Sequence, residues 1–410
     1  MKRFRWVVIF MIFVASMINY LDRSALSYAI KPLQDTFGLT NTDFGIVAAA
    51  FGIGYLIMTL IGGVLVDTYG ARKIWTISAV FWSIACACIG LATGFASIFI
   101  FRMILGLGEG PAFPALTRVS ADWLPVKERV RAMAFGLAAV PFASVLGAPL
   151  LSQLIASYGW RMMFFILGFV GILWAIAWHW IFRDRPSQSP YVSQAELQHI
   201  NNKQTQPIST VRTSWRFMLL NPTLLVNNYA FFSFGYLLFF AITWLPGYLE
   251  QTYHMQLKTI GWFLIAPWLT ATVFILLGGI ISDMIWSKTK SIRQSRSHII
   301  WVCQVLSVIC FIPVLITHSI IVVAIGISLG VGFGLMPNAA FYAINADLAH
   351  DRAGTSQGVM TCSFALSGII APLVTGWLSS LTGNFSVAII VMMALTFSSA
   401  ILIVLFQRPD

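Results

Sequence analysis

The chain consists largely of apolar stretches long enough to cross a lipid bilayer, and these stretches recur along all 410 residues. A transmembrane helix needs about 20 predominantly apolar residues. Twelve stretches meet this requirement, near residues 6–29, 42–66, 74–93, 95–120, 130–155, 160–182, 220–249, 258–283, 298–316, 319–345, 354–380 and 384–406. Only 10% of the residues are charged, against roughly 25% in soluble proteins. The sequence therefore predicts an all-α membrane protein with twelve transmembrane helices.

Lysine and arginine residues are distributed unevenly between the two sides of the predicted membrane. With the N-terminus in the cytoplasm, nineteen of the 25 lie on the cytoplasmic side and only Lys31, Arg161 and Lys258 lie outside. Positive residues favour cytoplasmic loops, so we predict that both termini are cytoplasmic, in a bacterial inner membrane or, as the alternative, in a eukaryotic organelle. The same residues explain the net charge of +11 without a nucleic-acid partner. A cleaved signal peptide is disfavoured, because the first apolar run continues as far as Arg23.

The second half of the chain repeats landmarks of the first half. Gly63 and Asp67 close the second stretch as Gly279 and Asp283 close the eighth, and basic residues follow both. The sequence Ala-Pro-Leu at 148–150 recurs at 371–373. Such a repeat indicates two six-helix halves that bind substrate near the bilayer midplane and alternate access by rocking against each other.

The longest connection separates these halves. We assign residues 1–182 to the N-terminal half, residues 183–219 to a cytoplasmic linker and residues 220–410 to the C-terminal half. Ser193 and Glu196 form a capping-box pattern, which predicts a short helix inside the linker.

Five ionisable side chains lie clearly within apolar stretches, all in the first third of the chain. They are Asp22, Arg23, Arg102, Glu109 and Arg118. A charge in hydrocarbon is costly unless it is paired or faces a water-filled cavity, so such residues indicate a functional site. The alternative is that Asp22 and Arg23 neutralise each other where helices pack.

Arg102 and Glu109 are seven residues apart, which places them on one helix face about two turns apart. A guanidinium group offers a planar fork to a carboxylate, so we predict that Arg102, with Arg23, binds an organic anion. Burial and neighbouring arginines shift the proton affinity of a carboxylic acid in opposite directions, so Asp22 and Glu109 are predicted to couple transport to H+. The alternative for Glu109 is a structural Glu–Arg pair. Arg118 is rotated by roughly 180° from Glu109 and is predicted to be a packing or gate residue.

Other polar residues complete the predicted site. Tyr20 is a candidate substrate contact, with an ordinary interfacial aromatic residue as the alternative. In the C-terminal half the candidates are Asn338 and Tyr342, followed by Asn227, Asn228, Tyr229 and Asn345. Each of these alone is more often a helix-packing residue.

No Walker loop, catalytic triad or metal-ligand pattern occurs in the sequence, and the five cysteines fall in apolar stretches. We therefore expect no enzymatic activity, cofactor or metal. The expected partners are a small organic anion, H+ and the lipid bilayer, and the protein is expected to be a monomer.

The loop after the second stretch resembles the loop signature of the major facilitator superfamily. The matching residues are Gly63, Asp67, Gly70, Arg72 and Lys73, whereas Thr68 stands where an arginine is usual. The resemblance implies the major facilitator fold. It also implies a conformational gate at Asp67, Gly70 and Arg72, repeated at Asp283, with a latch weakened by Thr68.

Three further motifs resemble the anion:cation symporter family. They are Asn19-Tyr20-x-Asp22-Arg23, Phe101-Arg102 with Gly108-Glu109-Gly110 and Phe113-Pro114, and Thr243-Trp244-Leu245-Pro246-x-Tyr248-Leu249. That family includes bacterial sugar-acid carriers and animal organic-anion and vesicular glutamate carriers. The resemblance implies secondary active, H+-coupled uptake of an organic anion such as a carboxylate or sugar acid, with Na+ as the alternative coupling ion.

Two segments depart from the sugar-acid carriers, which usually have amide side chains in segments five and eleven. Here these segments read Ala138-Ala139-Val140-Pro141-Phe142 and Thr361-Cys362-Ser363. The departure favours a less hydroxylated or larger carboxylate. An exporter of a drug or metabolite, a carrier of a carboxylate-type siderophore and a non-transporting receptor are the alternatives. The two arginines within apolar stretches, Arg23 and Arg102, argue against a drug exporter.

Overall fold

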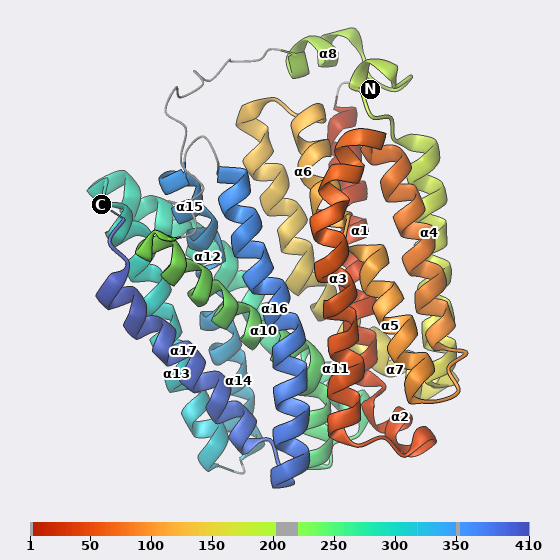
Figure 1. Cartoon of the computed structure of the whole chain (residues 1–410), viewed down its shortest axis with the longest axis vertical. Helices are drawn as coiled ribbons and strands as arrows, with labels where there is room; N and C mark the ends of the chain where they lie inside the picture. Colours follow the sequence, from red (N-terminus) through yellow and green to blue (C-terminus); the bar gives the residue numbers. More distant parts are fainter. Residues whose placement is uncertain (1–2, 202–219, 318, 350–352, 410) are drawn as a thin grey trace. The chain divides into compact units, whose positions relative to one another are not determined.

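The computed structural model describes residues 3–201, 220–317, 319–349 and 353–409, and every regular element in these residues is helical (Figure 1). The helices before the linker are α1 (Phe4–Tyr28), α2 (Ile30–Phe37), α3 (Asn41–Tyr69), α4 (Ala71–Ile89), α5 (Phe95–Glu109), α6 (Ala112–Trp123) and α7 (Val126–Ile181), and α8 (Gln194–Asn201) follows. The later helices are α10 (Pro222–Tyr253), α11 (Leu257–Phe263), α12 (Ile265–Thr289), α13 (His298–Ile316), α14 (Ile320–Leu335), α15 (Asn338–Ala349), α16 (Ala353–Thr382) and α17 (Ser386–Phe406). Residues 202–219 of the predicted linker lie outside the described residues.

The prediction of an all-α membrane protein is confirmed. Eleven segments of the described residues are long and apolar enough to cross a membrane. The prediction of twelve stretches differs only at α7, which contains two of them. Gly159, with φ 80° and ψ 162°, separates these two stretches within α7.

Three predicted helices are broken. The eighth stretch forms α11 and α12, which are separated at Leu264. The other two breaks lie at corresponding positions of the sequence repeat. The fourth stretch forms α5 and α6, which are separated at Pro111, and the tenth forms α14 and α15, which are separated at Pro337. Proline interrupts the helical hydrogen-bond ladder because it has no backbone N–H group. Glu109 is the last residue of α5, and Asn338 is the first residue of α15. Broken helices at matching positions of a repeat are typical of transporter binding regions.

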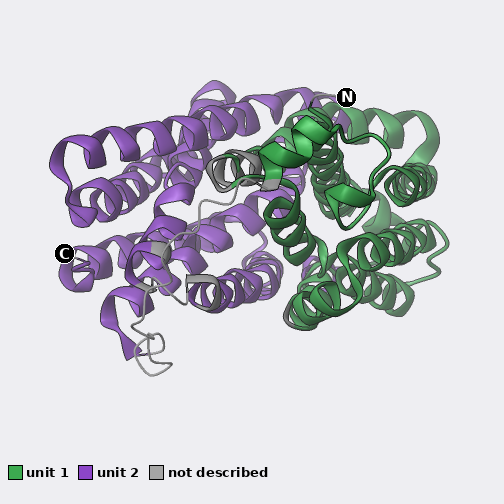
Figure 2. Cartoon of the chain, turned by 90° about the horizontal axis from the view of Figure 1, so that it is seen from above, with its two compact units in different colours: residues 1–39, 46–206 green, residues 40–45, 207–410 purple. Residues whose placement is uncertain are grey.

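Contacts within the chain divide it into two compact units (Figure 2). Unit 1 comprises residues 1–39 and 46–206, and unit 2 comprises residues 40–45 and 207–410.

Glycines let α3 and α5 pack closely in unit 1. A Cβ atom on Gly106 would collide with the carbonyl oxygen of Phe51, and one on Gly54 would collide with that of Met103. Small residues allow this approach of helix backbones inside a membrane. The close packing brings Phe51 to Arg102, whose guanidinium carbon lies 5.0 Å from the centre of the Phe51 ring.

The linker helix α8 caps the N-terminal end of α1. The carboxylate of Glu196, which is 3% exposed, accepts hydrogen bonds from the backbone nitrogens of Phe4 at 3.0 Å and Arg5 at 3.1 Å. The first N–H groups of a helix have no partner within the helix. The predicted helix in the linker is present, and Ser193 accepts a hydrogen bond from the Glu196 backbone nitrogen at 3.3 Å. The Glu196 side chain, however, caps α1.

Arg5 extends this contact to the start of α7. Its Nη1 donates to Glu196 at 3.1 Å, while its Nε and Nη2 donate to the two carboxylate oxygens of Glu128 at 2.8 and 3.2 Å. His199 of α8 lies 3.2 Å from the same carboxylate. We call Arg5, Glu128 and Glu196 the N-terminal brace, because they tie α1, α7 and α8 together.

The variant Glu196→Gln is expected to lower the melting temperature of the purified protein, because a neutral amide cannot replace a buried carboxylate with three donors. Hydrogen bonds to charged groups contribute about 1.5–3 kcal/mol each, so a loss of at least that size is expected. Thermal unfolding followed by tryptophan fluorescence measures it, and Glu250→Gln at the half-exposed end of α10 is the control. Equal melting temperatures for Glu196→Gln, Glu250→Gln and the native protein would show that the brace does not stabilise the fold.

The brace also predicts a dependence of stability on pH. Hydrogen bonding from Arg5 holds the pKa of Glu128 below its usual range. The carboxylate of Glu128 therefore stabilises the fold above the unfolded pKa of roughly 4, and this contribution is lost as the pH falls through the lower, folded pKa. Glu128→Gln should therefore destabilise the protein at pH near 7 and change its stability little at pH near 3. An equal destabilisation at both pH values would exclude ionisation as the cause.

Candidate functional site

A buried ion pair joins α1 to the end of α5 in unit 1. Nε of Arg23 lies 2.7 Å from Oε2 of Glu109, and these residues are 5% and 0% exposed. Three aromatic rings surround the guanidinium group, whose carbon lies 4.6 Å from the ring centres of Tyr20 and Tyr55 and 4.8 Å from that of Phe51. Contact between a cation and the face of an aromatic ring is attractive and strengthens when water is excluded.

Asp22 is fully buried beside this pair, yet Arg23 pairs with Glu109 instead. Successive residues of a helix point about 100° apart, which is why Asp22 and Arg23 face different neighbours. Among the described residues neither carboxylate oxygen of Asp22 has a hydrogen-bond partner, and the thiol of Cys86 on α4 lies next to it.

Arg102 is the second buried cation of this region. Its side chain is 4% exposed and packs on the Phe51 ring. Its Nε and Nη1 atoms have no hydrogen-bond partner in the part of the chain that the structure describes, and no described carboxylate lies within ion-pair distance. Such donors, held in a dry environment, favour an anion that fills the fork of the guanidinium group.

The four buried charges give the site a simple electrostatic property. With Asp22 and Glu109 both ionised, the two carboxylates balance Arg23 and Arg102. Protonation of one carboxylate leaves a net charge of +1, and a monovalent anion then restores neutrality. Unbalanced charge is costly in a low-dielectric interior, so the charge of each of these groups affects the cost of burying the others.

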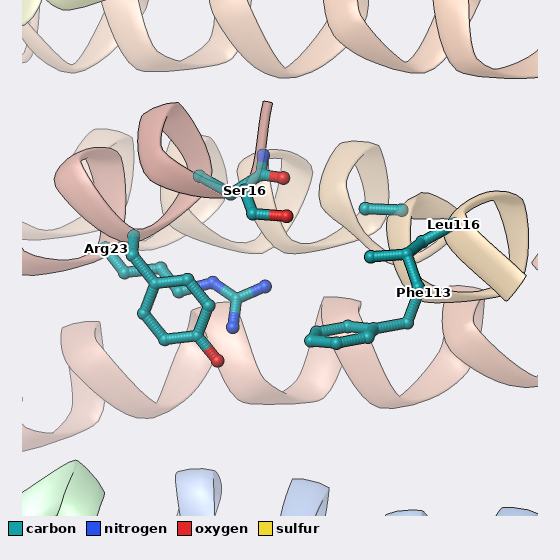
Figure 3. Close-up of a pocket in the computed structure, with 7 residues that line it drawn as sticks. Ser16, Arg23, Phe113 and Leu116 are labelled. Atoms are coloured by element: carbon teal, nitrogen blue, oxygen red, sulfur yellow. The ribbon is translucent and has the colours of Figure 1, made fainter. Parts of the chain in front are cut away.

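A small pocket lies beside the ion pair, between α1 and α6. Its lining residues are Ser16, Asn19, Tyr20 and Arg23 of α1 and Ala112, Phe113 and Leu116 of α6. Figure 3 shows the guanidinium group of Arg23 and the ring of Phe113 on opposite sides of this pocket. One wall is therefore polar and the other apolar.

The predicted site residues of the C-terminal half lie in unit 2. Asn338 is the first residue of α15, and the ring of Tyr342, one turn further, packs edge-on against Phe231 of α10 with ring centres 5.5 Å apart. These two residues lie one turn apart on α15 in unit 2, whereas the four charged residues belong to unit 1.

Two other asparagines of unit 2 hold helices together. Asn227 donates to the carbonyl oxygen of Phe341 at 3.1 Å and accepts from Gln407 at 3.3 Å. Asn345 donates to the sulfur of Met360 at 2.8 Å. Both asparagines are fully buried, and these hydrogen bonds give them a packing role. Tyr229 likewise bonds Ser398 at 2.8 Å.

The predicted gate residues form ordered contacts at the ends of helices. Asp67 lies 3.1 Å from Arg118, which also bonds Asp122 at 2.7 Å. Asp283 lies 3.0 Å from Arg296 in unit 2. Arg118 thus pairs with Asp67, and its role as a packing or gate residue stays a prediction.

The turn after Asp67 depends on a residue that the sequence reasoning missed. Gly70 has φ 84°, a conformation that suits glycine. Asp184, which follows α7, accepts a hydrogen bond from the backbone nitrogen of Arg72 at 2.8 Å. The Arg72 side chain donates to the carbonyl oxygen of His179 at 2.7 and 3.0 Å. The sequence signal for Asp184 was its position between two arginines, Arg183 and Arg185, directly after the sixth stretch.

Comparison with known proteins identifies the class. Residues 12–372 match the family model of the Major Facilitator Superfamily, and the chain belongs to this superfamily of transporters. The described residues contain no group of three or more histidine, cysteine, aspartate or glutamate side chains that could hold a metal ion. The chain is a multi-pass membrane transporter and not an enzyme.

Several relatives are named as transporters of organic anions. The chain is 33% identical over 410 residues to the "Probable galactarate/D-glucarate transporter GudP" of Bacillus subtilis, covering 94% of this chain and 88% of that protein. It is 30% identical to the "Probable sulfoacetate transporter SauU" of Cupriavidus necator, covering 92% and 88%. The fold is similar to that of a bacterial homolog of the human lysosomal transporter Spinster, with a TM-score of 0.78, 18% identity and coverage of 99% and 95%.

Proposed function

We propose that this protein takes up an organic anion together with H+ by alternating access. The observation that carries the proposal is the buried Arg23–Glu109 ion pair beside Arg102, a second buried cation with unused donors. The relatives named for galactarate/D-glucarate and for sulfoacetate support an anionic substrate.

The proposed cycle uses competition for Arg23. A proton that binds Glu109 breaks its ion pair, and Arg23 can then bind the anion together with Arg102. Tyr20 on α1 and Asn338 and Tyr342 on α15 are proposed as further substrate contacts. Release of the proton restores the carboxylate, which displaces the anion from Arg23. Asp22 is proposed as the second proton-binding residue because it is fully buried without an ion-pair partner among the described residues.

The substrate is proposed to have few hydroxyl groups. Ala138, Ala139 and Val140 of α7 offer no side-chain hydrogen-bond donor or acceptor. A sugar acid needs such groups, because a hydroxyl that is buried without a partner costs about 1–3 kcal/mol. A compact carboxylate or sulfonate, such as the sulfoacetate named for one relative, needs fewer of them.

The lysine and arginine distribution supports cytoplasmic termini in a bacterial inner membrane. In this orientation Asp67, Gly70, Arg72 and Asp283 lie on the cytoplasmic side and form the proposed gate. The protein is proposed to act as a monomer in which two six-helix halves, residues 1–182 and 220–410, rock against each other.

Uptake into proteoliposomes tests the proposal. Sulfoacetate, galactarate, D-glucuronate and succinate are supplied at equal external concentration, with the outside more acidic than the inside or with no pH gradient. Accumulation of at least one anion above its external concentration is expected only with the gradient, and a protonophore should abolish it. Accumulation that requires a Na+ gradient instead would refute proton coupling.

Asp67→Asn is expected to slow uptake several-fold with little change in anion affinity. The pair with Arg118 is 45% exposed at Arg118 and 68% exposed at Asp67, so it adds little stability. The proposed gate role of Asp67 instead predicts an effect on the equilibrium between conformations. Removing a cytoplasmic latch should favour inward-open forms, which increases labelling of cysteines introduced on the cytoplasmic side. Asp35→Asn, which breaks the exposed Lys31–Asp35 pair, is the control. Unchanged labelling with lost anion binding would mean that Asp67 shapes the site. Because Thr68 stands where an arginine is usual, the latch is weak, and we expect uptake to slow by only a few-fold.

A further inference from the structure

The exposed apolar face of α12 ends at a lysine. Leu276, Ile280 and Met284 are each more than half exposed, and exposed apolar side chains of a membrane protein contact the acyl chains of lipids. Residues four apart lie on the same helix face, so the exposed Lys288 continues this face beyond Met284. The ammonium group of Lys288 therefore lies where acyl chains give way to lipid headgroups.

An arginine lies at the end of a second exposed apolar face, on α17. Ile401, Val404 and Leu405 of that helix are about half exposed. Nη2 of Arg293 donates to the carbonyl oxygen of Val404 at 3.4 Å. The last carbonyl groups of a helix have no partner within the helix and favour a nearby cation. This contact keeps the Arg293 side chain at the end of α17.

A tight turn after α12 brings the basic residues together. Lys290, with φ 55°, ends α12, and its Nζ lies 5.8 Å from the centre of the Trp286 ring. Tryptophan is enriched at the level of lipid headgroups. The turn continues into η2 (Arg293–Ser297), a π-helix, which is a rare form often found at functional sites. We call Lys288, Lys290 and Arg293 the basic rim.

The acidic residue closest in sequence to the rim is already paired. Asp283 lies 3.0 Å from Arg296 of η2, so these two residues together add no net charge. Neither Lys288 nor Lys290 has an ion-pair partner in the part of the chain that the structure describes. Their positive charges are therefore available to an anion from outside the protein.

The order of apolar and positive groups indicates which anion fits. A positive charge anywhere in a cytoplasmic loop favours its orientation, and that preference does not require the charge to lie at the end of an exposed apolar face. A phospholipid presents a phosphate group directly above its acyl chains. Its phosphate can meet the basic rim while its acyl chains cover Met284 and Leu405, whereas a soluble anion leaves these side chains uncovered.

We propose that the basic rim binds the headgroup phosphate of an anionic phospholipid, whose acyl chains lie along the exposed faces of α12 and α17. Lys288 and Lys290 contact the phosphate oxygens, and Arg293 holds the headgroup at the end of α17. In the orientation proposed above, the rim faces the cytoplasmic leaflet, where anionic lipids attract basic segments. The inference does not depend on the transported anion or on proton coupling.

Fluorescence quenching of the full-length protein in bilayers tests this inference. The bilayers contain phosphatidylcholine with either brominated phosphatidylglycerol or brominated phosphatidylcholine, because bromine on an acyl chain quenches a tryptophan that it contacts. The signal is the part of the fluorescence that is lost in Trp286→Phe. The native protein should prefer phosphatidylglycerol, and Lys288→Gln combined with Lys290→Gln should lower this preference about 30-fold, because each lysine near anionic lipid contributes about fivefold.

The matched control removes the same charge elsewhere. Lys31→Gln combined with Lys258→Gln replaces two exposed lysines outside the rim and should keep the native preference. Lys288→Arg combined with Lys290→Arg keeps both charges at the rim and should also keep the preference, because arginine and lysine both bind phosphate.

Four outcomes would overturn the lipid site. They are equal quenching by the two lipids in the native protein, an unchanged preference when both rim lysines are glutamine, an equal loss in the control, and loss of the preference with arginine at both positions. Inorganic phosphate is compared with sodium chloride at equal ionic strength as a further arm. If inorganic phosphate alone abolishes the preference, the rim binds free phosphate and the lipid assignment is wrong.

Discussion

Replacing Arg102 with lysine is expected to weaken anion binding about 30-fold, although the charge is kept. Lysine loses the planar fork that holds two oxygens of one carboxylate or sulfonate. One lost charge-assisted hydrogen bond is worth about 1.5–3 kcal/mol, and about 2 kcal/mol corresponds to this change in affinity. Arg102→Ala should abolish binding, because it also removes the positive charge. The measurement is the rise in melting temperature on addition of the transported anion.

Arg161→Lys is the matched control for Arg102→Lys. Arg161 is an arginine of unit 1 that donates to the carbonyl oxygens of Gly90 and Ala92, outside the buried charge cluster. It should leave the anion-dependent shift unchanged. Affinity like that of the native protein in Arg102→Lys would refute the assignment of Arg102 as the anion clamp.

Replacing Glu109 with glutamine is expected to reduce uphill uptake at least about 100-fold while anion exchange across the membrane stays within about threefold. Glutamine resembles the protonated carboxyl group, so Arg23 would be available to the anion at every pH. Exchange of internal for external anion requires no net proton movement and therefore survives. Anion affinity should also lose its dependence on pH.

Proteoliposomes with and without an acid-outside pH gradient separate these activities, and Glu250→Gln serves as the control. If Glu109→Gln and Asp22→Asn both still concentrate the anion, proton coupling through these carboxylates is wrong. Loss of exchange together with uptake in Glu109→Gln, while the protein remains folded, would assign Glu109 to structure or to substrate binding.

The helices were predictable because their signal is local. Each needs only a run of apolar residues, and the positions of Gly159, Pro111 and Pro337 mark where runs end or break. The residue types of the candidate site were also evident, since charges such as Asp22 and Arg102 are costly in a membrane and therefore stand out.

The partners of these charges were not predictable, because they depend on how helices pack. Nothing in the sequence says whether Arg23 faces Asp22 next to it or Glu109, 86 residues away. The choice follows from the rotation of α1 against α5. Phe51 and Tyr55, which surround the guanidinium group of Arg23, read as ordinary apolar residues of a membrane helix. Their roles follow from the close contact of α3 and α5 at Gly54 and Gly106.

The roles of the asparagines in unit 2 were not predictable from the sequence either. Asn227 and Asn345 were candidates of second rank after Asn338, because all three are polar residues in apolar stretches. In the structure Asn227 accepts a hydrogen bond from Gln407, and Asn345 donates one to Met360 of the next helix, α16. A polar residue in a membrane segment marks a need for a partner, and only the tertiary structure tells whether that partner is protein.

The cap on α1 has a consequence for how the protein is made. Phe4 leaves the ribosome well before its partner Glu196, which lies 192 residues later in the chain. At about 5–20 residues per second, roughly 10–40 seconds pass before the cap can form. During this interval six apolar stretches are synthesised, and the N–H groups of the first turn of α1 have no Glu196 carboxylate to bind. Assembly of the first half is therefore completed only after its last membrane helix has been made, when the segment that leads to the second half emerges. A ribosome stalled before residue 196 should hold a first half whose N-terminal end remains open to protease.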